Sequence, residues 1–288
     1  MPRSMTGTLY IVATPIGNLE DISQRALRTL REVDVVACED TRRTRVLLNH
    51  FGIKTKTVSY HEHNERVRAE QLCEEMLSGR NVALVSDAGT PLISDPGFRI
   101  VQAAAKRDIP VVPIPGATAL VAALVASGLP SDQFFFAGFL PARANARRAR
   151  LEELCTISAT LVFYEAPHRI AATLKTAFEV LGNRRAVVAR ELTKLHEEIA
   201  RDSLSELARR FSGDKTARGE IVLVISGAAD ESTGRAESSP RDLMARVNEL
   251  ERSGLNGRIA LKQAARELGM KRAEAYRLLV AQKNRRSK

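Results

Sequence analysis

The stretch VSDAGTPLISDPG, Val85–Gly97, decides the fold of this chain. It continues an apolar run, Val82–Val85, that predicts a buried strand. Gly, Pro, Ser and Asp recur after that run, so the backbone makes a long excursion before a helix expected near Phe98. Loops of this kind, at the carboxyl ends of strands, are where α/β proteins bind small ligands. One such loop could be an ordinary strand–helix connection, but this chain has several.

Apolar runs alternate with helical segments through the first 116 residues. The expected strands are Thr8–Ala13, Asp34–Cys38, Thr57–Tyr60, Val82–Val85 and Pro110–Pro113. Helices are expected between them, and the first helix is expected to be capped by Asp21. Strands that alternate with helices imply parallel pairing through crossovers, so residues 1–116 are predicted to form an α/β domain.

A second α/β domain is expected over residues 117–227, beginning with the apolar helix Ala119–Ala126. Its expected strands lie near Phe134–Ala137, Leu161–Tyr164, Ala186–Arg190 and Glu220–Ile225. Helices are expected near His168–Leu181 and Leu204–Phe211. Two such domains would form a cleft between them.

The last segment is basic and helical. Residues 228–240 are rich in Ala, Ser, Glu and Gly and predict a linker. From Arg235 to Lys288 the chain has 14 basic and 6 acidic residues, and this net +8 supplies most of the overall charge of +10. In residues 241–288, the spacing of apolar positions around Gly269 favours a small all-α, helix-turn-helix-like domain. We expect Lys271, Arg272 and Arg277 to bind nucleic acid, although a helical cap that binds another protein would also fit.

The composition is that of a globular protein, with 44% apolar and 27% charged residues. Three cysteines without CxxC spacing argue against a disulfide framework and favour a reducing, cytoplasmic location. We expect no charged leader and no membrane span, because prolines interrupt the most apolar stretch, Val111–Leu129.

Polar loops follow most of the predicted strands and should converge on one cleft. They are Thr14–Leu19, Glu39–Arg42, His61–Asn64, Ser86–Gly97, Pro115–Thr118, Tyr164–Arg169 and Glu191–Lys194. None of them has the spacing of a metal site, a GxxxxGK[ST] phosphate loop, a GxGxxG turn or a GxSxG nucleophile elbow. Hydrolase and kinase functions are therefore not favoured, and no metal is expected.

Six motifs in this order resemble the ribosomal-RNA branch of the tetrapyrrole methylase superfamily. They are ATPIGNL (Ala13–Leu19), EDTR (Glu39–Arg42), SDAGTPLISDPG (Ser86–Gly97), PIPGATAL (Pro113–Leu120), FYEAPHR (Phe163–Arg169) and RELTK (Arg190–Lys194). The resemblance implies a non-Rossmann methyltransferase, usually a homodimer, that binds S-adenosylmethionine between two α/β domains. It further implies 2′-O-ribose methylation of a cytidine in the decoding region of small-subunit ribosomal RNA, on free RNA or on the assembled subunit.

The resemblance also implies the residues of the site. The cofactor would contact Pro15, Ser86, Asp87, Ala88, Gly89, Thr90, Ile93, Thr118, Ala119, Tyr164 and Leu192. The general base, if one acts, would be one of Asp40, His61, His63, Glu165 and His168. Arg42 and Arg169 would hold phosphates of the acceptor RNA.

Two other functions remain compatible with the residues. A ligand-sensing regulator could combine an α/β binding domain with a DNA-binding helix-turn-helix. A precorrin-type tetrapyrrole methylase would share the fold, but the first loop, Thr14–Asn18, lacks the GxGxGD-type glycines of those relatives. Such a methylase would also have no need of the basic tail.

Overall fold

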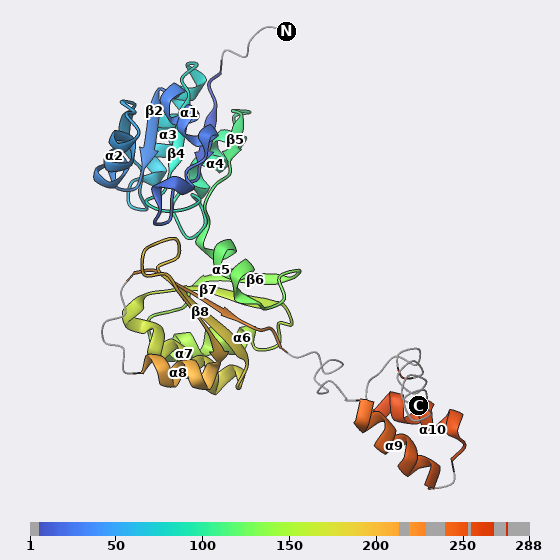
Figure 1. Ribbon diagram of the computed structural model, residues 1–288. Helices are drawn as coiled ribbons and strands as arrows, with labels where there is room; N and C mark the ends of the chain where they lie inside the picture. Colours follow the sequence, from blue (N-terminus) through green and yellow to red (C-terminus); the bar gives the residue numbers. More distant parts are fainter. Residues whose placement is uncertain (1–5, 213–218, 229–239, 253–254, 268–274, 276–288) are drawn as a thin grey trace. The chain divides into compact units, whose positions relative to one another are not determined.

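The computed structural model describes residues 6–212, 219–228, 240–252, 255–267 and Ala275 (Figure 1). The chain divides into two compact units, Met1–Gly227 and Ala228–Lys288. The first unit holds two five-stranded sheets, and each sheet has its own helical cover.

The first sheet is parallel throughout and has the order β3-β2-β4-β1-β5. Its strands are β1 (Leu9–Val12), β2 (Val35–Cys38), β3 (Lys56–Ser59), β4 (Val82–Val85) and β5 (Val111–Ile114). All four residues of β2 and of β4 are buried, because helices cover both faces of the sheet. The expected strand Val82–Val85 has the observed bounds, the other four differ by one residue at one or both ends, and the parallel pairing is confirmed.

The helices divide between the two faces as the alternation of strand side chains dictates. On one face, Val35, Ala37 and Leu84 pack with α3 (Glu65–Leu77) and α4 (Phe98–Ala105). On the other, Val36, Cys38 and Val85 pack with α1 (Gln24–Glu32) and α2 (Thr41–His50).

The cap expected for the first helix was wrong. Asp21 ends a short 3₁₀ turn, η1 (Leu19–Asp21), and α1 begins only after Ser23. Ser23 has the extended backbone of an N-cap, and its Oγ accepts a hydrogen bond from the amide of Ala26 at 3.1 Å.

The second sheet is mixed, with the order β6-β7-β10-β8-β9. Its strands are β6 (Phe134–Phe139), β7 (Thr160–Glu165), β8 (Arg185–Arg190), β9 (Glu198–Ser203) and β10 (Ile221–Ile225). β6 and β7 are parallel, whereas β10 runs antiparallel to both of its neighbours, β7 and β8. The edge strand β9 and the helix α6 (Ala144–Leu154) were not expected, because both are largely polar and lack a clear apolar period.

Helices cover both faces of this sheet too (Figure 1). On one face, α6, α7 (Ile170–Leu181) and α8 (Leu204–Phe211) pack over Phe163 and Leu223. On the other face, α5 (Ala119–Ser127) packs over Val162 and Val222. Ile16, from the loop after β1, belongs to this α5 cluster, so the first loop of the chain packs into the core of the second sheet.

The second unit contains α9 (Pro240–Arg252) and α10 (Gly257–Glu267), which pack together through small and apolar side chains. They include Leu243, Val247, Leu250, Ala260, Leu261, Ala264 and Ala275. Of the expected third helix, Lys271–Gln282, Ala275 alone is described, and Lys271, Arg272 and Arg277 lie outside the described residues. The domain limits at residues 116, 227 and 240 stay predictions. Within the described ranges, no helix is both long and apolar enough to cross a membrane.

Candidate active site

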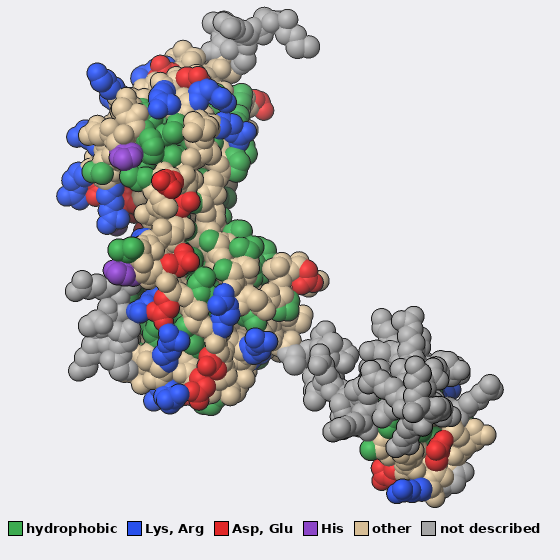
Figure 2. Space-filling model, in the orientation of Figure 1, with side chains coloured by type: hydrophobic (Ala, Val, Ile, Leu, Met, Phe, Trp, Pro, Cys, Tyr) green, Lys and Arg blue, Asp and Glu red, His purple; other side chains and the backbone are tan. Residues whose placement is uncertain are grey.

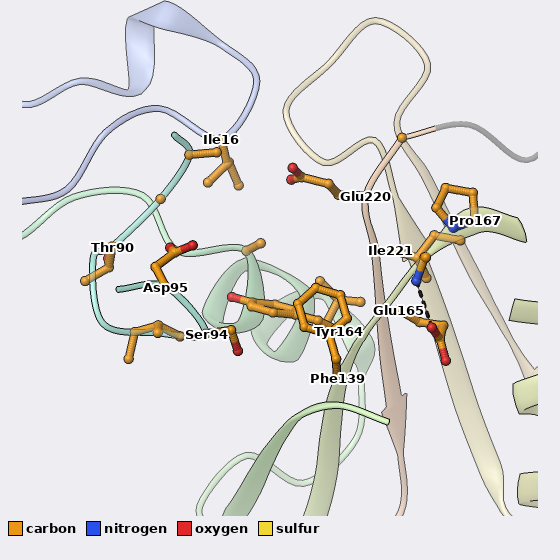
Figure 3. Close-up of a pocket in the computed structure, with 17 residues that line it drawn as sticks. Ile16, Thr90, Ser94, Asp95, Phe139, Tyr164, Glu165, Pro167, Glu220 and Ile221 are labelled. Atoms are coloured by element: carbon orange, nitrogen blue, oxygen red, sulfur yellow. Dashed lines mark hydrogen bonds between the residues drawn. The ribbon is translucent and has the colours of Figure 1, made fainter. Parts of the chain in front are cut away.

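A cavity of about 280 Å³ opens where the loop after β4 faces the carboxyl end of β7 (Figure 3). The first-sheet loops contribute Ile16, Ala88, Gly89, Thr90, Ile93, Ser94 and Asp95. The helix α5 and the second sheet contribute Ala119, Phe139, Tyr164, Glu165, Gly219 and Glu220, among others. The predicted cleft therefore exists, and its walls come from segments far apart in the sequence.

The loop after β4 is held to the end of β1 by hydrogen bonds. The amide of Thr14 donates to the carbonyl of Gly89 at 2.8 Å, and the amide of Gly89 donates back to Thr14 at 3.1 Å. The hydroxyl of Ser86 donates to the same Gly89 carbonyl at 3.2 Å. Gly89 has φ +83°, a left-handed conformation that a glycine adopts at little cost.

Strained backbone is concentrated in two loops, one of which lines the cavity through Ser94. Four of the five described residues other than glycine that have positive φ lie in just two loops: Leu92 and Ser94 after β4, and Glu191 and Thr193 after β8. Such conformations cost energy and persist where the surrounding structure enforces them, which is common at functional sites. Both loops correspond to motifs that the sequence singled out.

The predicted cofactor residues divide into two groups. Those that line the cavity are Ala88, Gly89, Thr90, Ile93, Ala119 and Tyr164. Pro15, Ser86, Asp87, Thr118 and Leu192 are not among its lining residues. Several of these support the wall instead: Thr118 shares a 2.7 Å hydrogen bond between hydroxyls with Thr90, and Leu192 is buried in the α5 cluster.

Asp87 is directed toward α2 rather than the cavity. Its Oδ1 accepts a hydrogen bond from the amide of Asp40 at 3.1 Å, and its Oδ2 lies 3.3 Å from Nη1 of Arg43. Asp87 therefore ties the start of α2 to the cavity loop.

Among the predicted catalytic residues, Glu165 alone is in the cavity lining, and its carboxylate is occupied. The side chain is completely buried, and Oε2 accepts a hydrogen bond from the Thr173 hydroxyl at 2.5 Å. Oε1 accepts from the amide of Ala166 at 2.8 Å and lies 3.2 Å from Nε of Arg169. Figure 3 shows the carboxylate turned away from the open space. This geometry gives Glu165 a structural role at the start of α7.

Asp40 and Arg42 are engaged with each other at the start of α2. The carboxylate of Asp40 accepts from Arg42 Nη2 at 2.8 Å and from Nε at 3.1 Å. These hydrogen bonds lower the pKa of Asp40 to about 2. A carboxylate with so low a pKa is a poor proton acceptor near neutral pH, so the geometry does not favour Asp40 as the base.

The histidines and Arg169 also lie outside the cavity lining. His61 Nε2 is 3.2 Å from Nδ2 of Asn64, and the ring centroids of His61 and His63 are 5.9 Å apart. His168 is exposed in the short turn η2 (Pro167–Arg169). Arg169 donates to the carbonyl of Leu140 as well as pairing with Glu165, so it holds the turn in place.

Two carboxylates that the sequence reasoning missed face the cavity. Asp95 and Glu220 extend into the same space from opposite walls (Figure 3). Burial, and then the charge of Glu39, raise the pKa of Asp95 to about 6, and Asp87 and Glu220 add to the effect. Asp95 belongs to the quoted SDAGTPLISDPG motif and could have been selected. Glu220 could not, because its position depends on β10 running antiparallel between β7 and β8.

The remaining wall is apolar and aromatic. Tyr164 packs edge-on against Phe136, with ring centroids 4.9 Å apart, and lies 5.5 Å from Phe139. Burial raises the pKa of the Tyr164 phenol, so it stays protonated at neutral pH. The cavity thus combines a flat apolar surface with two carboxylates and loop backbone. No group of three His, Cys, Asp or Glu within the described ranges is placed to hold a metal ion.

The family model for tetrapyrrole (corrin/porphyrin) methylases matches residues 8–208. A protein of Halalkalibacterium halodurans named ribosomal RNA small subunit methyltransferase I is 47% identical over 279 residues, which cover 96% of each chain. A protein of the same name from Vibrio cholerae is 53% identical over 224 residues, which cover 77% of this chain and 78% of that one.

Solved structures show the same fold at lower identity. A cobalt precorrin-4 methyltransferase superposes with a TM-score of 0.59 at 17% identity, covering 78% of this chain and 97% of that one. The uroporphyrin-III C-methyltransferase of Thermus thermophilus, solved with S-adenosyl homocysteine, gives a TM-score of 0.54 at 20% identity, covering 76% and 97%. From the family match and the near full-length identity, we conclude that this chain belongs to the tetrapyrrole methylase family.

Proposed function

We propose that this protein transfers the methyl group of S-adenosylmethionine to the 2′-hydroxyl of a cytidine in the decoding region of small-subunit ribosomal RNA. The observation that carries the proposal is 47% identity over 96% of the chain to a ribosomal RNA small subunit methyltransferase I. The tetrapyrrole enzymes, at 17–22% identity, support the fold alone. The regulator alternative has no comparable support.

The cavity suits the proposed cofactor in chemistry. Ile16, Ile93, Ala119 and Tyr164 offer apolar surface for an adenine ring, and the loop after β4 offers backbone groups for polar ends. The carboxylates of Asp95 and Glu220 provide negative charge for a molecule that carries a sulfonium and an ammonium. When bound, S-adenosylmethionine supplies an electrophilic methyl group.

Asp95 is the residue best placed to take the proton from the acceptor hydroxyl. With a pKa of about 6, its carboxylate is mostly ionised at neutral pH yet remains a stronger base than an ordinary aspartate. Its position in the cavity wall allows it to act directly on a hydroxyl that enters the cavity. Glu165 and Arg169 hold the opposite wall in place.

The acceptor is ribosomal RNA in free or assembled form, and we propose the assembled small subunit. The basic tail would bind structured RNA through its backbone and shape, which is how RNA helices are mostly recognised. Such docking would bring one nucleotide to the cavity.

We also propose that the protein acts as a homodimer. β6 is an edge strand of the second sheet, and its side chains Phe134 and Phe135 are 45% and 38% exposed. Exposed phenylalanines on an unpaired edge are suited to burial against a second copy. Light scattering should show a dimer, and Phe134→Ser with Phe135→Ser should convert it to monomer; a wild-type monomer would contradict the proposal.

The function is tested by incubating small ribosomal subunits with labelled S-adenosylmethionine and analysing the nucleosides by mass spectrometry. We expect 2′-O-methylcytidine at one position with the wild-type protein. Asp95→Asn should reduce kcat by at least about 100-fold, as loss of a general base does. Asp108→Asn is a matched control, since Asp108 is an exposed aspartate in the turn after α4. Transfer to a tetrapyrrole and none to the subunit would refute the proposal.

A further inference from the structure

The helix α2 carries an exposed array of arginines. Arg42, Arg43 and Arg45 lie in its first two turns, and α2 contains no acidic residue. The side chain of Arg42 is 88% exposed and that of Arg43 is 70% exposed. The buried side of the same helix is formed by Thr44 and Leu48. Figure 2 shows Lys and Arg side chains gathered along the edge of the first sheet where Figure 1 draws α2.

This array is physically joined to the cavity. The start of α2 is tied to Asp87 by the Asp40 amide and by Arg43, at 3.1 Å and 3.3 Å. Asp87 directly precedes Ala88, which lines the cavity. When a polymer places one of its residues in the cavity, the neighbouring residues of that polymer can therefore contact α2.

The charges of the cavity and of α2 indicate which kind of polymer α2 would bind. The cavity and its border are acidic: burial raises the pKa of Asp95 and of Glu39; the charges of Glu39, Asp87 and Glu220 raise that of Asp95 further, and Asp87 adds to the rise for Glu39. Such a centre repels a polyanion unless cations stand beside it. The arginines of α2 supply these cations, and an arginine forms bidentate hydrogen bonds with phosphate.

Three arginines on the opposite face of the sheet are engaged in ion pairs. There, Arg99 pairs with Glu65, Arg107 with Glu70 and Arg80 with Glu75. On α2, Arg42 pairs with Asp40 and Arg43 with Asp87, but the two arginine side chains stay 88% and 70% exposed, so their guanidinium groups remain open to a phosphate. Arg45 has no carboxylate within ion-pair distance among the residues that the structure describes.

We infer that the outer face of α2, formed by Arg42, Arg43 and Arg45, is a second RNA-binding surface that holds the phosphates flanking the target nucleotide. This inference rests on the proposed function. The helix would position the RNA strand at the cavity, in addition to the binding expected from the basic tail. Its phosphate contacts would fix register and would carry no base specificity.

The test compares two triple variants of the full-length protein with equal changes of charge. One variant replaces Arg42, Arg43 and Arg45 by glutamine. The control variant replaces Arg66 and Arg68 of α3 and Lys106, which follows α4, also by glutamine. Methyl transfer to small subunits is measured over a range of salt concentrations, and cofactor affinity by calorimetry. We expect the α2 variant to raise KM for the subunit at least about tenfold at moderate salt and to reduce the salt slope of log KM by about 2–3. The control should match the wild type in both.

The inference fails if the α2 variant keeps the wild-type KM and salt slope, or if the control changes equally. If the triple variant loses cofactor binding or fails to fold, the single variants Arg45→Gln and Arg45→Glu provide the test. Arg45 pairs with no carboxylate among the described residues, so replacing it breaks no ion pair there. They should raise KM progressively, and unchanged values would overturn the inference. A wild-type protein that transfers no methyl would instead refute the proposed function. Binding of a labelled ribosomal RNA fragment to the same variants would then still test α2.

Discussion

The Glu165 carboxylate and the Thr173 hydroxyl form a 2.5 Å hydrogen bond in which both groups are fully or almost fully buried. Glu165 ends β7 and Thr173 lies in the first turn of α7, so the bond joins the strand to the helix. The same carboxylate holds the Ala166 amide and Arg169. One side of the cavity therefore depends on a buried charge that is already satisfied.

Replacing Glu165 should affect folding more than chemistry. Glu165→Ala would leave the buried Thr173 hydroxyl without its partner and Arg169 with the Leu140 carbonyl alone, and we expect a loss of about 3–5 kcal/mol in the free energy of unfolding. Urea denaturation measures this. Glu153→Ala on the surface of α6 should cost less than about 1 kcal/mol. A Glu165→Gln variant with full stability and no turnover would instead indicate a catalytic role.

The stability of the protein without ligand should depend on the ionisation of Asp95. Its pKa of about 6 in the folded state exceeds the ordinary value of about 3.9, so the folded state binds this proton more tightly than the unfolded state does. The associated stability is present below about pH 4 and is lost as the pH rises to about 6. Denaturation at several pH values should show that the free energy of unfolding of Asp95→Asn rises relative to that of the wild type between about pH 4 and pH 6. Above about pH 7 the difference between the two proteins should be constant. A stability difference independent of pH would show that the pKa of Asp95 in the folded protein is not raised.

Gly17 should be intolerant of a side chain, because Lys194 lies across it. A Cβ at Gly17 would be 2.5 Å from Cγ of Lys194 and 3.0 Å from Oγ1 of Thr193. Gly17→Ala must displace the Lys194 side chain or the loop that carries Ile16 into the cavity. We expect cofactor affinity to fall about tenfold, equivalent to about 1.4 kcal/mol, when measured by calorimetry.

A double variant tests the cause of that loss. Lys194→Ala removes the obstructing side chain along with its ion pair to Glu191. In the Lys194→Ala background, Gly17→Ala should reduce cofactor affinity much less than it does in the wild-type protein. An equal loss of cofactor affinity in both backgrounds would mean that the Lys194 side chain is not what excludes a Cβ at Gly17.

The tail should supply part of the affinity for RNA. Replacing Lys271, Arg272 and Arg277 by alanine removes three positive charges, and we expect a higher KM for the subunit with a salt slope shallower by about 2–3. Cofactor affinity should not change. A matched control replaces Arg148, Arg150 and Lys175 on α6 and α7. Unchanged RNA binding would favour a tail that contacts another protein.

Most of the fold of the first unit was predictable because its signals are local. Apolar runs such as Val82–Val85 and Val35–Cys38 predict buried strands, and the turn residues after them predict where each strand stops. β9 and α6 escaped prediction because they cover a core that other elements build. The buried residues of α6 are Arg147, Leu151 and Leu154, so an arginine interrupts the apolar pattern, and β9 buries Ala200 alone.

The sequence by itself determined the loops of the site, because Gly, Pro, Ser and Asp limit the backbone within a few residues of where they occur. Which side chains of those loops face the cavity was decided only by the tertiary structure. Asp87 turns to α2 and Glu165 to α7, whereas Asp95 and Glu220 extend into the cavity from opposite walls. The direction of a side chain depends on strand pairing and on the packing of distant segments, which no local pattern records.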